Sequence, residues 1–260
     1  MEAQCLGTTV HYELSGSGAK KVVLLHGWGC STELMAPIAA GLEADMTVLN
    51  LDFPGFGKSG RPPQPWGVPE YAACIRELLE QLHFLPCSVI AHSFGGRVAI
   101  WLASSGECPF EKLILTGAAG IRKPATPESE RRSAEFKKKK EQLQRLKKLP
   151  LLGGLAASME EKLRQQYGSA DYNALDEEMR RTFVKVINLD LTDRLPAVAA
   201  PTLLMWGTAD TETPLWMGKK MEELIPDAGL VELSGGTHFA YLEQQARFVQ
   251  VARVFLLEQN

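Results

Sequence analysis

Cysteine is scarce in this sequence, and the five that occur among its 260 residues are scattered, with no pair spaced as CxxC. An odd and dispersed set predicts neither a disulfide framework nor a zinc site. Long apolar runs are also missing. The longest stretch without Asp, Glu, Lys or Arg, residues 81–96, is shorter than the ~18 apolar residues that a membrane span needs. Residues 1–14 lack the basic and apolar regions of a signal peptide, so we expect a cytoplasmic protein.

Positive charge is not in excess over the whole chain, which has a net charge of -3 and an isoelectric point of about 6.0. This balance excludes a generally basic nucleic-acid binder. Hydrophobic residues make up 45% and charged residues 23%, which is the composition of a globular protein. The sequence has no GxGxxG motif, no P-loop and no metal-ligand spacing, so we expect no nucleotide cofactor and no metal.

Short β-branched and apolar runs alternate along the chain with longer segments whose apolar residues recur at helical spacing. This alternation predicts an α/β fold with a mostly parallel central sheet and helices on both of its faces. A length of 260 residues is compatible with one such domain. Strands are predicted at residues 9–14, 22–26, 47–52, 88–92, 112–116, 202–206 and 230–233, and helices at 71–82, 96–103 and 244–257.

Residues 121–187 break this rhythm, because they contain no strand pattern and are rich in helix-forming residues. Within them, residues 122–148 carry 11 Lys and Arg against 4 Glu, a local charge of +7. We predict a helical cap, or lid, between the core segments 1–120 and 188–260, over the sheet edge where open α/β sheets place their sites. A solvated lid is the favoured interpretation of its lysines. Attraction of anionic substrates, or weak contact with an anionic membrane surface, is the alternative.

The sharpest local pattern is Ala91-His92-Ser93-Phe94-Gly95, which joins a predicted strand to a predicted helix. Small residues two before and two after a serine let the backbone pass through a tight turn that lifts the hydroxyl above the sheet. The following helix directs its N-terminus at the serine and favours negative charge there. Ser93 is therefore a candidate nucleophile, with a simple strand-to-helix loop as the alternative. We expect the side chain of His92 to point to the other side of this turn.

A second pattern, His26-Gly27-Trp28-Gly29, follows another predicted strand. Backbone N–H groups of a glycine-rich turn can converge on an oxyanion, and the N–H groups of Trp28 and Phe94 are the predicted donors. Asp210 and His238 come directly after the predicted strands at 202–206 and 230–233. Strand ends of a parallel sheet meet at one edge. The chain order Ser, Asp, His therefore predicts a Ser93–His238–Asp210 triad.

Together these motifs resemble the α/β-hydrolase fold superfamily, in particular its lidded, carboxylesterase-like serine hydrolases. The resemblance covers essentially the whole chain and includes Asp52-Phe53-Pro54-Gly55-Phe56-Gly57-Lys58-Ser59, which is similar to the superfamily's D-x-P-G-x-G-x-S loop. It implies a cap inserted after the sixth strand. It also implies that Asp52 fixes a loop, while Asp210 is the triad acid. Ala91 departs from the glycine that usually opens the serine motif.

This resemblance defines the substrate poorly, because many reactions share the scaffold. A carboxylic ester is the preferred substrate, and Trp28, Phe94 and Phe239, with Trp206 as a further candidate, predict a pocket for an apolar acyl group. The other activities considered are a carbon–carbon bond hydrolase, a cofactor-free perhydrolase and an acyltransferase. A non-catalytic binding protein is disfavoured because all three triad candidates are present.

Overall fold

The computed structural model describes residues 1–106, 108–147 and 153–258. The chain forms two compact units: a core of Met1–Ile121 with Val184–Asn260, and a second unit of Arg122–Phe183. The second unit falls within the segment 121–187 in which the sequence predicts a cap. That this unit covers a site stays a prediction.

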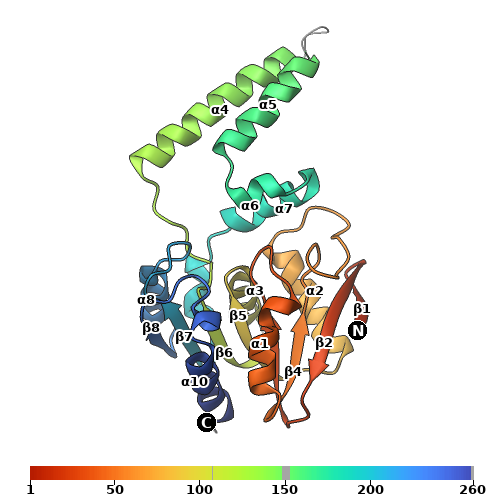
Figure 1. The fold of residues 1–260 in the computed structure, drawn as a ribbon, viewed down its shortest axis with the longest axis vertical. Coiled ribbons are helices and arrows are strands. Elements are labelled where there is room, and N and C mark those ends of the chain that lie inside the picture. Colours follow the sequence, from red (N-terminus) through yellow and green to blue (C-terminus); the bar gives the residue numbers. More distant parts are fainter. Residues whose placement is uncertain (107, 148–152, 259–260) are drawn as a thin grey trace. The chain divides into compact units, whose positions relative to one another are not determined.

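Eight strands of the described core form one sheet in the order β1-β2-β4-β3-β5-β6-β7-β8 (Figure 1). β2 is antiparallel to both β1 and β4. The remaining strands, in the sheet order β4-β3-β5-β6-β7-β8, are parallel to one another. The prediction of a mostly parallel α/β sheet is therefore confirmed. The strands are β1 (Glu2–Cys5), β2 (Thr8–Ser15), β3 (Lys20–Leu25), β4 (Met46–Leu51), β5 (Cys87–His92), β6 (Phe110–Thr116), β7 (Thr202–Gly207) and β8 (Ala228–Leu233).

The central strand β5 is buried along its whole length, because helices cover the sheet on both faces. On one face, α1 (Thr32–Leu42) and α10 (Gln245–Leu257) pack against each other and share a core with β3 and β4. Elsewhere α2 (Val68–Gln81) packs on α3 (Phe94–Ala103), and α8 (Leu215–Leu224) packs on β7 and β8. The short helices η1 (Thr192–Ala197) and α9 (Ala240–Glu243) complete the described core.

The start of α2 shows how local sequence sets an element's position. Pro69 stands in the first turn, where its missing N–H costs no helical hydrogen bond. The Glu70 carboxylate reaches back and accepts the N–H of Gly67 at 2.7 Å. These two features start the helix at Val68, three residues before the predicted start at Tyr71.

The second unit is built from helices in its described residues, as the absence of strand patterns predicts. They are α4 (Pro127–Lys147), α5 (Gly153–Tyr167), α6 (Ala170–Ala174) and the start of α7 (Glu177–Asn188). α4 and α5 pair antiparallel through Lys147 with Glu160 and through Lys139 with Tyr167. Lys148, which ends the predicted basic stretch, lies outside the described residues. No helix within the described ranges has the length and apolar character needed to cross a membrane.

Candidate active site

Ser93 lies at the turn between β5 and α3 in a left-handed backbone conformation, with φ +50° and ψ −109°. A non-glycine residue rarely adopts such angles, and surrounding packing has to hold it there. Two glycines make the turn possible. A Cβ on Gly95 would lie 2.3 Å from the Leu25 carbonyl oxygen, and one on Gly96 would lie 2.4 Å from the Ala118 methyl group. The structure thus places the predicted nucleophile on a strained strand-to-helix turn.

The backbone of Ser93 is fixed to the loop that follows β6. Its N–H donates to the Thr116 carbonyl at 3.3 Å, and its own carbonyl accepts the N–H of Ala119 at 2.9 Å. Gly117, between these two anchors, has φ +49°. A Cβ there would lie 3.2 Å from both Asp210 Oδ2 and His238 Nδ1. The loop that holds the serine therefore also touches the predicted acid and base.

Asp210 and His238 form a direct pair, with 2.8 Å between Oδ2 and Nδ1. A carboxylate only accepts hydrogen bonds, so this contact places the proton of neutral His238 on Nδ1 and leaves Nε2 unprotonated. Burial alone would raise the pKa of Asp210. Hydrogen bonds from His238 and Thr213 outweigh it, and the pKa of the carboxyl is lowered. The acid is thereby kept ionised beside the imidazole.

Thr213 is a site residue that the sequence analysis missed. Its hydroxyl lies 2.9 Å from both Asp210 Oδ2 and the Gly117 carbonyl oxygen, and its single proton serves one acceptor at a time. Its N–H, with that of Glu212, donates to Asp210 Oδ1 at 2.9 Å. The available signal was the spacing Asp-x-x-Thr, because an aspartate often accepts from N–H groups two and three residues ahead.

The glycine turn after β3 contacts the serine turn. A Cβ on Gly27 would lie 2.8 Å from His92 Nδ1 and 3.3 Å from the Ser93 Cβ. The Gly95 N–H donates to the His26 carbonyl at 3.1 Å, which ties the two turns together. The predicted oxyanion turn and the predicted nucleophile are therefore neighbours.

Asp52 binds two backbone segments through its carboxylate, as expected for an acid that fixes a loop. Its buried carboxylate accepts the N–H of Thr32 at 2.6 Å and the N–H of Lys58 at 2.8 Å. His26 accepts the N–H of Phe53 on Nε2 at 3.0 Å, so its proton is on Nδ1, which donates to the Gly27 carbonyl. Burial lowers the pKa of His26 to about 4 and keeps it neutral.

The predicted pocket residues are not equivalent. The rings of Trp28 and Phe94 meet at 5.4 Å between centroids, but Phe94 is only 3% exposed and also packs on Phe53. Phe239 is 39% exposed and lies against the His238 ring at 5.5 Å. Trp206 is fully buried and donates its indole N–H to the Thr213 carbonyl, so the suggestion that it lines a pocket is wrong.

His92 lies differently from the prediction, which turned its side chain to the other side of the Ser93 turn. Its ring packs on that of His238 at 4.7 Å between centroids, and its Nε2 lies 2.9 Å from the His238 carbonyl oxygen. The side chain therefore contacts the candidate base instead of turning away from the site.

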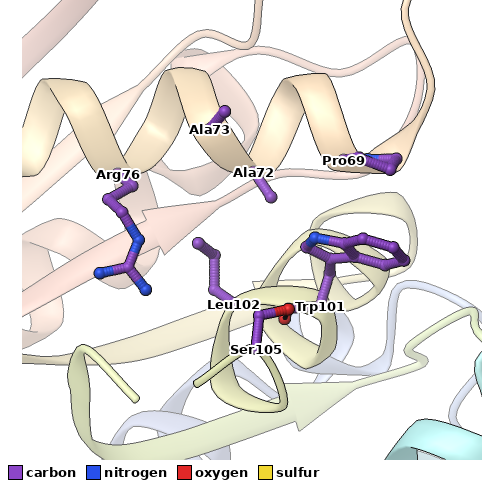
Figure 2. A pocket seen from close by; sticks show the side chains of 7 residues that line it. All are labelled: Pro69, Ala72, Ala73, Arg76, Trp101, Leu102 and Ser105. Carbon is purple, nitrogen blue, oxygen red and sulfur yellow. Dashed lines mark hydrogen bonds between the residues drawn. The ribbon is translucent and has the colours of Figure 1, made fainter. Parts of the chain in front are cut away.

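A cavity of about 460 Å³ lies between α2 and α3 (Figure 2). Seven described residues line it, and Arg76 is the one charged side chain among them. Figure 2 shows Trp101 and Ser105 across the cavity from Arg76, which lies on α2. Because no acid or histidine lines this cavity, it offers no nucleophile–base pair and is separate from the candidate active site. No group of His, Cys, Asp and Glu in the described ranges is placed to hold a metal ion.

Comparison with known proteins places this geometry in a family. A family model described as the alpha/beta hydrolase family matches residues 22–251. A pimeloyl-[acyl-carrier protein] methyl ester esterase of Chromobacterium violaceum is 26% identical over 88% of this chain and 91% of its own length. A 2-hydroxy-6-oxononadienedioate/2-hydroxy-6-oxononatrienedioate hydrolase of a Pseudomonas species is 25% identical over 95% of this chain and 92% of its own.

Among solved structures, the enol-lactonase of Burkholderia xenovorans has the same fold, with a TM-score of 0.75 and 22% identity over 99% of this chain and 100% of its own. The family model covers most of the chain. The chain belongs to the alpha/beta hydrolase family.

Proposed function

We propose that this protein is a serine hydrolase that cleaves carboxylic esters, with Ser93 as nucleophile, His238 as general base and Asp210 as the acid of the triad. The observation that carries the proposal is the 2.8 Å contact of Asp210 with His238 beside the strained Ser93 turn. The Asp210 contact fixes the imidazole tautomer whose Nε2 can accept a proton from a serine hydroxyl.

In the proposed first step, His238 Nε2 takes the Ser93 hydroxyl proton while the serine oxygen bonds to the ester carbonyl carbon. The carbonyl oxygen becomes an oxyanion, which the N–H groups of Trp28 and Phe94 stabilise. Phe94 is the first residue of α3, so the positive end of the helix dipole adds to this stabilisation. Asp210 stabilises the imidazolium through its charged hydrogen bond.

The tetrahedral intermediate then collapses, and His238 donates its acquired proton to the departing alcohol oxygen. An acyl group remains on Ser93. A water molecule, deprotonated by His238, attacks the acyl carbon, and the proton returns to the Ser93 oxygen as the carboxylic acid leaves. An ester is the preferred substrate because its alcohol leaving group requires no machinery beyond this one base.

The substrate is proposed to be a small ester with an apolar acyl group. Trp28, which is half-buried, and Phe239 offer aromatic surface at the site. Similarity to a methyl ester esterase supports ester chemistry, while similarity to a 2-hydroxy-6-oxononadienedioate hydrolase keeps a carbon–carbon bond hydrolase as the alternative. The second unit, residues 122–183, is proposed as the lid.

The test combines a fluorophosphonate probe with hydrolysis of p-nitrophenyl esters of increasing chain length. The native protein should be labelled at Ser93 and should hydrolyse the esters. Ser93→Ala should lose labelling and lower turnover by roughly 10⁴- to 10⁶-fold. Ser17→Ala is the matched control, because Ser17 is exposed in the turn between β2 and β3. Most of the esterase activity surviving in Ser93→Ala would refute the assignment.

A further inference from the structure

His92 occupies an unusual place, since it directly precedes the nucleophile yet extends its side chain to the loop after β8. It is the last residue of β5 and is 1% exposed. Its Nε2 lies 2.9 Å from the His238 carbonyl oxygen. A carbonyl only accepts, so the ring must carry its proton on Nε2 and donate it there.

The surroundings of the His92 ring hold it in this orientation. Besides the His238 ring, it packs on Tyr241 at 4.7 Å and on Phe239 at 5.3 Å between ring centroids. Its Nδ1 is buried without a hydrogen-bond partner and faces Gly27, where a Cβ would come within 2.8 Å. A polar atom left unpaired in the interior costs stability. The hydrogen bond from Nε2 to the His238 carbonyl is therefore the one that holds the polar side of the ring in place.

The titratable groups that face His92 are His238 and Asp210 on the loops after β8 and β7, His26 directly after β3, and Tyr241 on α9. Burial, followed by the charge of His238, lowers the pKa of His92 to about 3. The ring stays neutral around neutral pH, so it adds no second cation beside His238 when that base takes up its proton.

We propose that His92 is a positioning residue of the triad, whose Nε2–H donates to the His238 carbonyl and thereby couples the strand that carries the nucleophile to the backbone of the base. This inference rests on the proposed function. One peptide unit joins Ser93 to His92, and one side-chain hydrogen bond joins His92 to His238. The link is short, so its loss changes the distance and angle at which Nε2 of His238 meets the serine oxygen.

The expected loss of kcat follows from the sensitivity of proton transfer to geometry, since a displacement of about 1 Å can lower a rate by roughly 10²-fold. The effect falls on the chemical step, because His92 is buried and contacts the base rather than the substrate surface. We therefore expect kcat to change much more than KM.

The test compares two substitutions of similar size that differ in hydrogen bonding. His92→Leu removes the donor, whereas His92→Gln keeps an amide N–H at about the reach of Nε2. His92→Leu should lower kcat by roughly 10- to 10²-fold with little change in KM. His92→Gln should restore kcat to within about fivefold of the native value. His83→Asn is the control, because His83 is exposed and its left-handed backbone suits asparagine.

Thermal unfolding accompanies each measurement, so that kcat is compared among folded proteins only. Equal losses of kcat in His92→Leu and His92→Gln, or native kcat in His92→Leu, would overturn the positioning role. Failure of the proposed function looks different: the native protein would not be labelled by the fluorophosphonate, or Ser93→Ala would still be labelled. The two failures are therefore distinguishable.

A second measurement needs no active variant. Nitrogen-15 NMR of the native protein, with the His92 signals assigned by their absence in His92→Gln, reports which ring nitrogen carries the proton. We expect Nε2–H and an unprotonated Nδ1, with no change between about pH 5 and 8. A proton on Nδ1 would mean that the His238 carbonyl receives no hydrogen bond from His92, which would overturn the proposal.

Discussion

Lowering the pH from about 7 to 5 should destabilise the folded protein, because His26 and His92 are buried in their neutral forms. Burial lowers the pKa of His26 to about 4 and that of His92 to about 3. Both return to about 6.5 in the unfolded chain. The unfolded state therefore takes up protons in a range where the folded state does not, and acid shifts the equilibrium towards unfolding.

The sign and the size follow from these values. Each pKa is lower in the folded state, so its stabilising contribution is complete above about pH 6.5 and is lost as the pH falls towards about 4 for His26 and about 3 for His92. At about pH 5 the unfolded chain holds nearly one more proton per histidine than the folded chain. Integration from pH 7 to 5 gives a loss of about 2 kcal/mol per histidine. Two such losses are a large share of the roughly 5–15 kcal/mol that stabilises a typical domain.

The assay is urea unfolding at about pH 7, 6 and 5 for the native protein, His92→Gln and His83→Asn. Between about pH 7 and 5 the free energy of unfolding should fall by about 2 kcal/mol less in His92→Gln than in the native protein, because one of the two buried histidines is gone. His83 is exposed, so its replacement should leave the pH dependence unchanged. The comparison requires equal denaturant slopes, which report the surface exposed on unfolding.

An unaltered pH dependence in His92→Gln would refute this reasoning. It would mean that His92 binds no additional proton when the chain unfolds, and hence that its site does not exclude the charged form. A pH dependence in His83→Asn as shallow as that of His92→Gln would show that the difference from the native protein does not come from burial of the histidine.

Four further outcomes are expected. Asp210→Asn should lower kcat by roughly 10⁴-fold, because it presents the wrong tautomer of the base. Asp52→Asn should lower the free energy of unfolding, measured in urea, more than it lowers kcat. Gly117→Ala should lower both, because its Cβ would press on the acid–base pair at 3.2 Å and its φ is +49°. If the lysines of α4 attract anions, kcat/KM for an anionic ester should fall with salt, while kcat/KM for a neutral ester of equal chain length stays constant. Changing residues 137–140 to Gln should abolish this difference between the two esters.

The central sheet could be predicted because its parallel strands are continuous apolar runs that end in recognisable turns. β5 is buried at every residue and β6 at every residue except Glu111. The edge strand β1 was not predicted, since it has four residues, of which one is buried. The helix α1 was missed as well, because Pro37 lies inside it and breaks the pattern on which a helix prediction depends.

The residues of the proposed triad could be named because each follows a strand, and parallel strands end at one edge. The residues that hold them could not. Thr213 bonds to Gly117 across 96 positions of the sequence, and His92 bonds to His238 across 146. Such contacts depend on strand order and loop conformation, which spacing along one chain does not encode. Only the Asp210–Thr213 turn is local enough to have been read from sequence.

For Phe94, the predictions for the backbone and for the side chain have to be considered separately. From the sequence, its backbone N–H is predicted to donate to the oxyanion and its side chain is predicted to line the substrate pocket. A side chain in the first turn of a helix points back towards the preceding elements, and the Phe94 ring packs on Phe53 and Tyr71 in the core. The ring therefore anchors the start of α3. Truncating the ring should therefore act through the position of that helix, whereas Trp28 is half-buried and Phe239 is 39% exposed.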